Sequence, residues 1–238
     1  VGQSQRGREN EERPTLDKFI EDGPFRIHYN EEGEHAPINE NGTFDFDYVE
    51  QVGIAAKYSY DFILSLEYED TYILDCSDDC TNFGGNSSYD IYIENLPLGN
   101  EILYGENVPD DWDVQETTYI RIDNGFTESE YSTNGLDAMK TTIAHELFHA
   151  IQRSYKAIPT SNEYFYEMSS TWIEDLIYPE INDYIHDSWT KKFFDNPEIN
   201  IYQSGGYSLA LYAHYLTSVI DVDGDYSIIK EIWEKFEN

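Results

Sequence analysis

The stretch Thr141-Thr-Ile-Ala-His145-Glu146-Leu-Phe-His149-Ala-Ile-Gln152 decides how the rest of the chain is interpreted. It lies in a segment from Gly135 to Tyr155 whose apolar residues wrap most of a helix, which predicts a helix buried at the domain centre. Two histidines four residues apart lie on one helical face, so both imidazoles can reach one zinc ion. Glu146 is rotated about 100° from the first histidine, so its carboxylate can reach a water on the metal rather than the metal itself. The alternative is an amphipathic helix whose histidines are ordinary hydrogen-bonded groups.

A catalytic zinc ion usually has three protein ligands and one open position. The candidate for the third ligand is Glu167, which follows His149 by 18 residues on a second predicted helix at about Tyr164 to Ile177. That distance allows a turn and a return helix beside the first. The small Ser169 and Ser170 favour close packing of the two helices.

This combination of residues resembles a known enzyme class. His-Glu-x-x-His followed at this distance by Glu167, then small residues, an aromatic residue and Glu174, is similar to the gluzincins, the zinc metallopeptidases whose third ligand is glutamate. The segment from Glu167 to Glu174 resembles the aminopeptidase branch. His149-Ala-Ile-Gln152 followed by Trp172-Ile-Glu-Asp is more similar to a poorly characterised group of microbial metallopeptidases that are assumed to be secreted. The strongest resemblance covers Thr141 to Tyr178.

The resemblance implies that His145, His149 and Glu167 bind one zinc ion and that Glu146 is the general base and later the proton donor. The chemistry of the residues agrees, because zinc lowers the pKa of its water toward about 7 and a carboxylate can accept the proton during attack on a peptide carbonyl. Glu174 lies two helical turns after Glu167, where a carboxylate could orient a ligand histidine. Its rival for that role is Asp175, and a solvent-facing Glu174 is an alternative.

Members of the family commonly add a Tyr or His that donates a hydrogen bond to the oxyanion. Tyr202-Gln-Ser-Gly205 resembles the Tyr-x-x-Gly segment of the aminopeptidase branch, and Tyr207 is a second candidate. For either tyrosine, ordinary packing is the alternative. The Gly-x-Met-Glu-Asn segment with which that branch grips a substrate N-terminus is absent from this sequence, which favours an endopeptidase.

The charge balance excludes several partner classes. The chain has 14 Lys and Arg against 48 Asp and Glu, a formal net charge of −34. Nucleic acid and anionic membranes are therefore poor partners. The acidic surface is interpreted either as simply solubilising or as suited to high salt, calcium or a cationic substrate. Apolar stretches are too short for a membrane span.

Cys76 and Cys80 are close together in a turn-rich acidic loop, which suits a small disulfide ring and an oxidising compartment. Two free thiols or thiolate ligands to a metal are the alternatives. Ca²⁺ is a further cofactor candidate at acids of two loops, Asp75, Asp78 and Asp79 in one and Asp221, Asp223 and Asp225 in the other. The second loop does not fit an EF-hand and is better explained as a connection between two helices.

The patterns predict an α+β fold in which a flexible arm, residues 1–14, precedes one zincin-like domain, residues 15–238. Its strand-rich part, 15–134, is expected to form a mixed β-sheet packed on the active-site helix, and its mostly helical part, 135–238, to meet the sheet at a cleft. The predicted strands are 25–29, 89–93 and 118–122, and the remaining predicted helices are 46–66, 184–194, 206–220 and 227–236.

Together these observations predict a secreted zinc metallopeptidase, a hydrolase that acts as an extracellular endopeptidase on peptide or protein substrates. One alternative is a zinc esterase or amidohydrolase with the same metal site. The other is a non-catalytic binding or adhesion module stabilised by zinc, although a structural site has no use for a base such as Glu146. The oligomeric state is left open.

Overall fold

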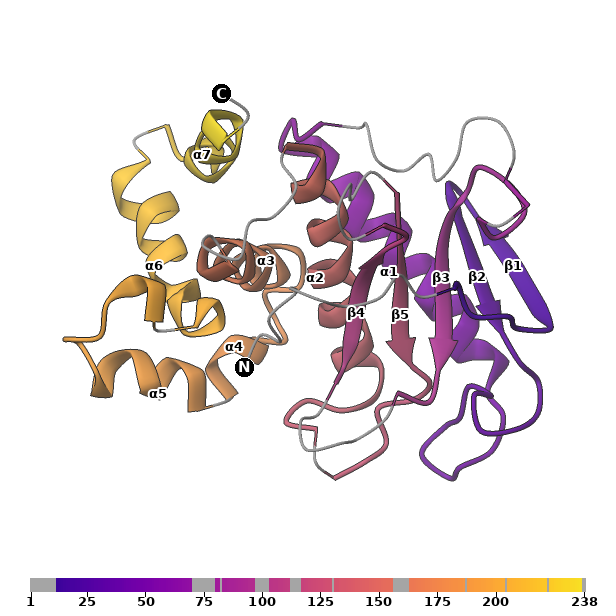
Figure 1. Cartoon of the computed structure of the whole chain (residues 1–238). Coiled ribbons are helices and arrows are strands. Elements are labelled where there is room, and N and C mark those ends of the chain that lie inside the picture. The colour runs from indigo at the N-terminus through magenta and orange to yellow at the C-terminus, as the bar shows by residue number, and fades with distance from the viewer. Residues whose placement is uncertain are drawn as a thin grey trace.

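The computed structural model describes residues 12–69, 80–81, 83–96, 103–111, 117–129, 131–155, 163–186, 188–203, 205–221 and 223–236. Figure 1 shows an α+β protein in which the first part contains the strands and one helix between them, and the described elements that follow are helical. The strands are β1 (Lys18–Asp22), β2 (Phe25–Tyr29), β3 (Tyr89–Glu94), β4 (Gly105–Pro109) and β5 (Thr118–Asp123). The α-helices are α1 (Phe46–Ser65), α2 (Gly135–Tyr155), α3 (Glu163–Ile177), α4 (Asp183–His186), α5 (Ser188–Asp195), α6 (Ala210–Tyr215) and α7 (Ser227–Phe236). Three short helical segments complete them, η1 (Ile201–Gln203), η2 (Gly206–Leu209) and η3 (Leu216–Ile220).

The strands form one mixed sheet with the order β1-β2-β3-β5-β4. The three central strands, β2, β3 and β5, run parallel, and β1 and β4 join them antiparallel at the two edges. The expectation of a mixed sheet is confirmed, and the three predicted strands are the central ones. The two edge strands were not predicted.

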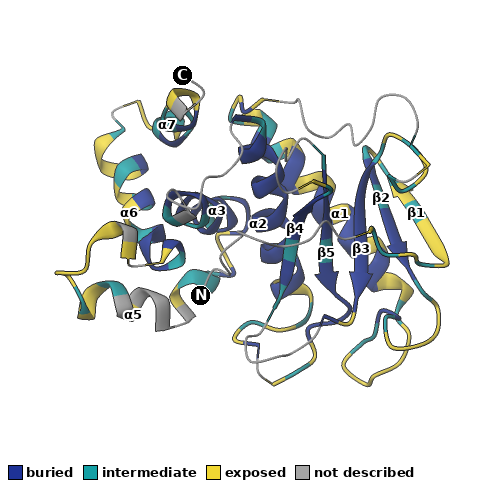
Figure 2. Cartoon of the chain, viewed as in Figure 1, coloured by how far each residue is buried: buried dark blue, intermediate teal, exposed yellow. Residues whose placement is uncertain are grey.

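One face of the sheet is covered by α1 and α2, as Figure 1 shows. The first turn of α1 is capped by Asp45, whose carboxylate accepts a hydrogen bond from the backbone N–H of Asp47. Most of α2 is buried, as its apolar pattern predicts, and it packs against β4 and β5. Figure 2 shows this burial along α2 and the central strands. The core between sheet and helices therefore fixes the position of α2.

The opposite face of the sheet is partly covered by the segment before β1. Arg13 donates two hydrogen bonds of 2.7 Å to the carboxylate of Asp110 and one of 2.7 Å to Asp90, which is fully buried. Its guanidinium also lies 5.0 Å from the centre of the Tyr119 ring. Arg13 belongs to the predicted arm and is anchored on the sheet, whereas residues 1–11 lie outside the described residues. The division into an arm and one domain stays a prediction.

The segments after α2 are helical in the described part of the chain. The predicted helix 184–194 corresponds to α4 and α5, and residue 187 between them lies outside the described residues. The predicted helix 206–220 is helical throughout but changes its hydrogen bonding, from a 3₁₀ turn in η2 to α-helix in α6 and a π-turn in η3. A 3₁₀ turn at a helix end is common, whereas a π-turn is rare.

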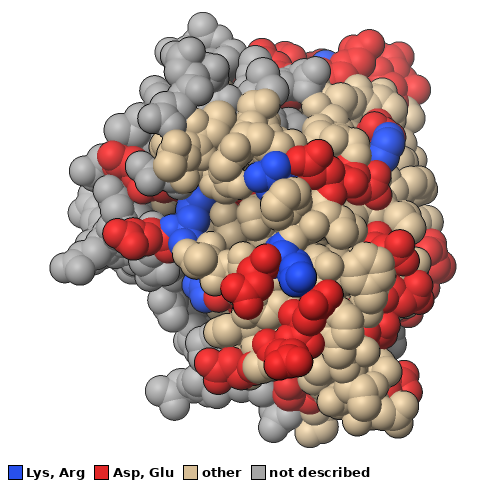
Figure 3. Space-filling view, turned by 90° about the vertical axis from the view of Figure 1, so that its right-hand side faces the viewer, with Lys and Arg blue, Asp and Glu red and all other residues tan. Residues whose placement is uncertain are grey.

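The surface agrees with the composition. Figure 3 shows the side of the molecule at the right of Figure 1, where acidic side chains are spread widely and basic ones are scattered among them. Cys80 is disulfide-bonded, as the predicted ring requires, while Cys76 lies outside the described residues. Among the described helices, none has the length and apolar character needed to cross a bilayer.

Candidate metal centre

The buried helix α2 places three of the predicted site residues together. His145, Glu146 and His149 each offer a ligand atom, and these atoms lie within 4.8 Å of one another. Only 5%, 8% and 5% of these residues is exposed. Buried side chains of this kind are retained when they are paired or bind a metal. The histidine rings lie at 89° to each other with their centres 4.5 Å apart, so they meet edge to face and are not stacked.

Glu167 on α3 completes the arrangement that its spacing predicts. Its Oε2 lies 3.2 Å from Nε2 of His145 and 3.6 Å from Nε2 of His149. Ligands held at about 2.0 to 2.1 Å in a tetrahedron are separated by about 3.3 Å, so both distances from the Glu167 oxygen are close to those expected in a zinc site. Two imidazoles and one carboxylate are also a donor set that zinc accepts. The residues therefore fit the predicted ion.

The outer nitrogen of His145 is held by Glu174. Nδ1 of His145 is hydrogen-bonded to Oε1 of Glu174 on α3, which is the contact predicted for a carboxylate that orients a ligand histidine. The rival candidate, Asp175, instead lies 3.4 Å from Nε2 of His214 on α6. The Glu174 carboxylate accepts a hydrogen bond from Nδ1–H, and Nε2 is the nitrogen that faces Glu167.

His149 is held differently. Its Nδ1 lies 2.9 Å from Oε1 of Gln152 and 2.9 Å from Oγ of Ser170, and its ring stacks on Tyr166 with a centre-to-centre distance of 3.8 Å. The sequence pattern predicts no role for Gln152 or Tyr166. The sequence did contain one indication for Gln152: it is a polar residue three positions after the predicted ligand His149, at a helical position where an apolar residue would be expected.

The segment η2 forms the next wall of the site. Gly206 lies so close to α3 that a Cβ atom on it would be 2.2 Å from Cβ of Glu167. This contact places the Tyr207 ring parallel to the His145 ring at 5.6 Å, and the phenol hydrogen-bonds to Glu167. Of the two tyrosine candidates, Tyr207 is thus at the site. Tyr202 lies in η1, but its side chain is outside the described residues.

Burial and mutual contact shift the pKa values of the three candidate ligands. Burial acts to lower the pKa of His145, but hydrogen bonds to Glu167 and Glu174 outweigh it and raise this pKa well above 6.5. Burial lowers the pKa of His149 to about 4, against the opposing charge of Glu167. For Glu167, burial acts to raise the pKa, but the charge of His149 and a hydrogen bond from His145 hold it well below its usual range. Glu167 is therefore ionised at neutral pH, as a metal ligand must be.

Burial also raises the pKa of Glu146 to about 7, with the charge of Glu167 adding to the effect and that of His145 opposing it. The backbone N–H of Asn107 in β4 donates a hydrogen bond to this carboxylate. Close contact of β4 with α2 depends on Gly105, where a Cβ atom would lie 2.6 Å from Cγ2 of Thr142. A carboxyl group with a pKa near 7 is suited to accept and return a proton.

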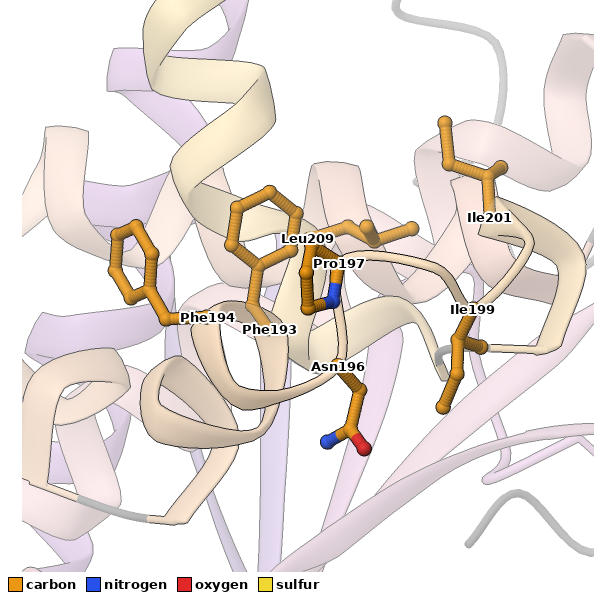
Figure 4. Close-up of a pocket in the computed structure, with 7 residues that line it drawn as sticks. All are labelled: Phe193, Phe194, Asn196, Pro197, Ile199, Ile201 and Leu209. Carbon is orange, nitrogen blue, oxygen red and sulfur yellow. The ribbon is translucent and has the colours of Figure 1, made fainter.

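Other predicted or conspicuous features lie apart from this centre. The loop with Asp221, Asp223 and Asp225 connects η3 to α7, as predicted, and Asp221 and Asp225 accept hydrogen bonds from nearby backbone N–H groups. Asp75, Asp78 and Asp79 are outside the described residues. An apolar hollow of about 250 Å³ lies between the end of α5 and η1–η2 (Figure 4), and none of the predicted site residues lines it. The hollow is lined by Phe193, Phe194, Asn196, Pro197, Ile199, Ile201 and Leu209.

Comparison of the chain with protein-family models, curated proteins and solved structures gave no match. The chemistry of the centre must therefore be inferred from its own geometry. Two imidazoles and a carboxylate converge on one point, and a fourth group with a pKa near 7 lies beside them.

Proposed function

We propose that this protein is a zinc metallopeptidase with a zincin-like fold, whose third metal ligand is Glu167. The observation that carries the proposal is the convergence of the Glu167 carboxylate on the inner nitrogens of His145 and His149, at 3.2 and 3.6 Å. The outer nitrogen of each ring is occupied by its own partner, as is usual for histidines that bind a metal.

Nε2 of His145, Nε2 of His149 and the carboxylate of Glu167 would hold the ion. When bound, zinc acts as a Lewis acid that lowers the pKa of water toward about 7 and polarises a carbonyl group. Three protein ligands leave one coordination position for solvent or substrate, and this distinguishes a catalytic site from a structural one.

Glu146 moves the proton in this proposal. Its carboxylate accepts a proton from the water that attacks the peptide carbonyl carbon, and then gives that proton to the nitrogen of the leaving amine when the C–N bond breaks. In the metal-free chain, burial raises the pKa of this carboxyl to about 7, so a proton on Glu146 is less costly there than on an exposed carboxylate. The Asn107 N–H keeps the carboxylate on the side of α2 that faces β4.

Tyr207 is the proposed donor to the developing oxyanion. Its phenol reaches Glu167, and burial raises its pKa well above 10, so the O–H keeps its proton throughout. A neutral donor aimed at the position where negative charge develops stabilises the transition state. The disulfide at Cys80 supports an oxidising, extracellular setting for the enzyme.

Metal analysis and cleavage of a denatured protein substrate test the proposal together. We expect one zinc per chain and cleavage that falls by about 10²- to 10⁴-fold in Glu146→Gln, with zinc retained. Glu231→Gln, an exposed position on α7, is the matched control and should cleave as the wild type does. Equal activity of Glu146→Gln would remove this residue from the mechanism. Hydrolysis of esters without peptides would favour an esterase, and bound zinc without hydrolysis would favour a binding module.

A further inference from the structure

Gln152 is a buried polar side chain that connects the two helices of the metal centre. It is 0% exposed and lies one turn after His149 on α2. Its Nε2 lies 3.1 Å from the backbone oxygen of Tyr166, 2.9 Å from Oγ of Ser169 and 3.0 Å from Oγ of Ser170, all on α3. Its Oε1 lies 2.9 Å from Nδ1 of His149. Every polar atom of the amide therefore has a partner.

The acceptors on α3 fix which way this amide points. A backbone carbonyl can only accept, so the NH₂ group must face Tyr166. Ser169 donates its own hydrogen to the Phe165 carbonyl at 2.7 Å and is left to accept from Gln152. If the amide were flipped, its oxygen would face the Tyr166 carbonyl with no hydrogen between them, in a site closed to water. Buried polar groups avoid such pairs of acceptors. Oε1 must then be the atom that faces His149.

The orientation of the amide in turn decides the position of a proton. Oε1 can only accept, so Nδ1 of His149 carries the hydrogen, and a neutral imidazole with a proton on Nδ1 has a free electron pair on Nε2. We propose that Gln152 is a positioning residue that holds His149 in its Nδ1–H tautomer, so that the free pair on Nε2 faces Glu167 before any metal binds. The tautomer follows from the contacts alone, while its use as a metal ligand rests on the proposed function.

Ser170 cannot set the tautomer by itself. Its hydroxyl lies at the same distance from Nδ1, but a hydroxyl can rotate to donate or to accept and so fits either tautomer. His145 has a different partner at its Nδ1, the carboxylate of Glu174. The two candidate histidines therefore have different partners, and the neutral amide of Gln152 adds no further negative charge to a centre that already contains Glu146, Glu167 and Glu174.

Nitrogen NMR of the metal-free full chain, labelled with ¹⁵N-histidine, tests the inference at neutral pH. We expect Nδ1–H for His149 in the wild type and in Ser170→Ala, and a shift toward the Nε2–H form in Gln152→Met, which is similar in size but offers no acceptor. Gln152→Glu supplies an oxygen acceptor again and should restore Nδ1–H. Zinc affinity, measured by competition with a chromophoric chelator, should fall about 10- to 100-fold in Gln152→Met. Ser154→Ala, on the same helix, should bind zinc as the wild type does.

Two results would overturn the inference. The first is an Nε2–H tautomer for His149 in the wild type, a measurement that needs no variant to fold. The second is an unchanged Nδ1–H tautomer in Gln152→Met together with unchanged zinc affinity. Because the tautomer is measured without metal or substrate, a chain that shows it but cleaves nothing would refute the proposed peptidase activity and leave the role of Gln152 intact.

Discussion

Replacing Gly206 by alanine tests whether η2 must lie directly on α3 for the centre to form. The new Cβ would lie 2.2 Å from Cβ of Glu167, 2.6 Å from the Tyr164 carbonyl oxygen and 2.8 Å from the Met168 nitrogen. Two of these atoms belong to the backbone of α3, so no change of side-chain rotamer can relieve the clash. Ordinary contacts begin at 3.4 Å, and η2 must therefore move away by roughly 1 Å.

The expected cost follows from this displacement. Forcing extra volume into a packed contact costs about 1 to 3 kcal/mol of the free energy of unfolding. Tyr207 would move with η2, and a shift of about 1 Å in a reacting group can lower the rate about 10²-fold. Glu167 carries the contacted Cβ, so zinc should bind about 10-fold more weakly or worse.

Gly224→Ala is the control for a loss of stability away from the centre. Gly224 has a φ of +67°, and no atom lies within 4 Å of the position that a Cβ would take there, so alanine costs about 1 kcal/mol through backbone strain alone. Urea unfolding measures the stability of both variants, and chelator competition measures zinc affinity. Wild-type zinc affinity and activity in Gly206→Ala would refute the assigned contact between η2 and α3.

Three further predictions concern proton binding, folding and catalysis. The pKa of His145 is raised, so its proton stabilises the metal-free fold below pH 6.5, and this contribution is lost as the pH rises through the raised value. Zinc must replace that proton, so the Kd for zinc, measured by titration, should rise as the pH falls from about 8 to about 6. A constant Kd would contradict the assignment of His145 as a ligand. Arg13→Ala should lower the free energy of unfolding, measured by urea denaturation, by about 3 kcal/mol, because it leaves buried Asp90 without its arginine. Lys57→Ala, at an exposed ion pair, should change it by less than about 1 kcal/mol. Equal effects of the two substitutions would refute the role of Arg13 in anchoring its segment to the sheet. Tyr207→Phe should lower kcat about 10²-fold without weakening zinc binding, and an unchanged kcat would exclude the phenol as the oxyanion donor.

The helices and strands that could be predicted are those whose own residues carry the pattern of apolar spacing typical of a helix or a strand. The central strands and the helices α1, α2, α3 and α7 carry apolar residues at the spacing of their own structure, and the structure has them close to the predicted bounds. The edge strands lack that signal. β1 is short, charged and mostly exposed, and β4 contains Gly, Asn and Pro, residues that are uncommon in strands. Both owe their conformation to a neighbouring strand.

The residues of the candidate site also differ in whether a local sequence pattern predicts them. The spacing of His145 and His149 fixes a helical face, and the distance to Glu167 allows a return helix, so these three could be predicted as a group. Gln152 could not, because its partners are a backbone carbonyl and serines on α3, and a tertiary contact decides what its amide faces. The anchoring of Arg13 on the far face of the sheet likewise depends on two acids that lie 77 and 97 residues away along the chain.

X-ray absorption at the zinc edge of the loaded protein measures the central claim most directly. We predict two imidazole nitrogens at about 2.0 to 2.1 Å and carboxylate oxygen at about 2.0 to 2.2 Å, with zinc weakly held or absent in Glu167→Ala. A wild-type chain that retains no zinc, or a spectrum and zinc content unchanged in Glu167→Ala, would contradict the proposed centre.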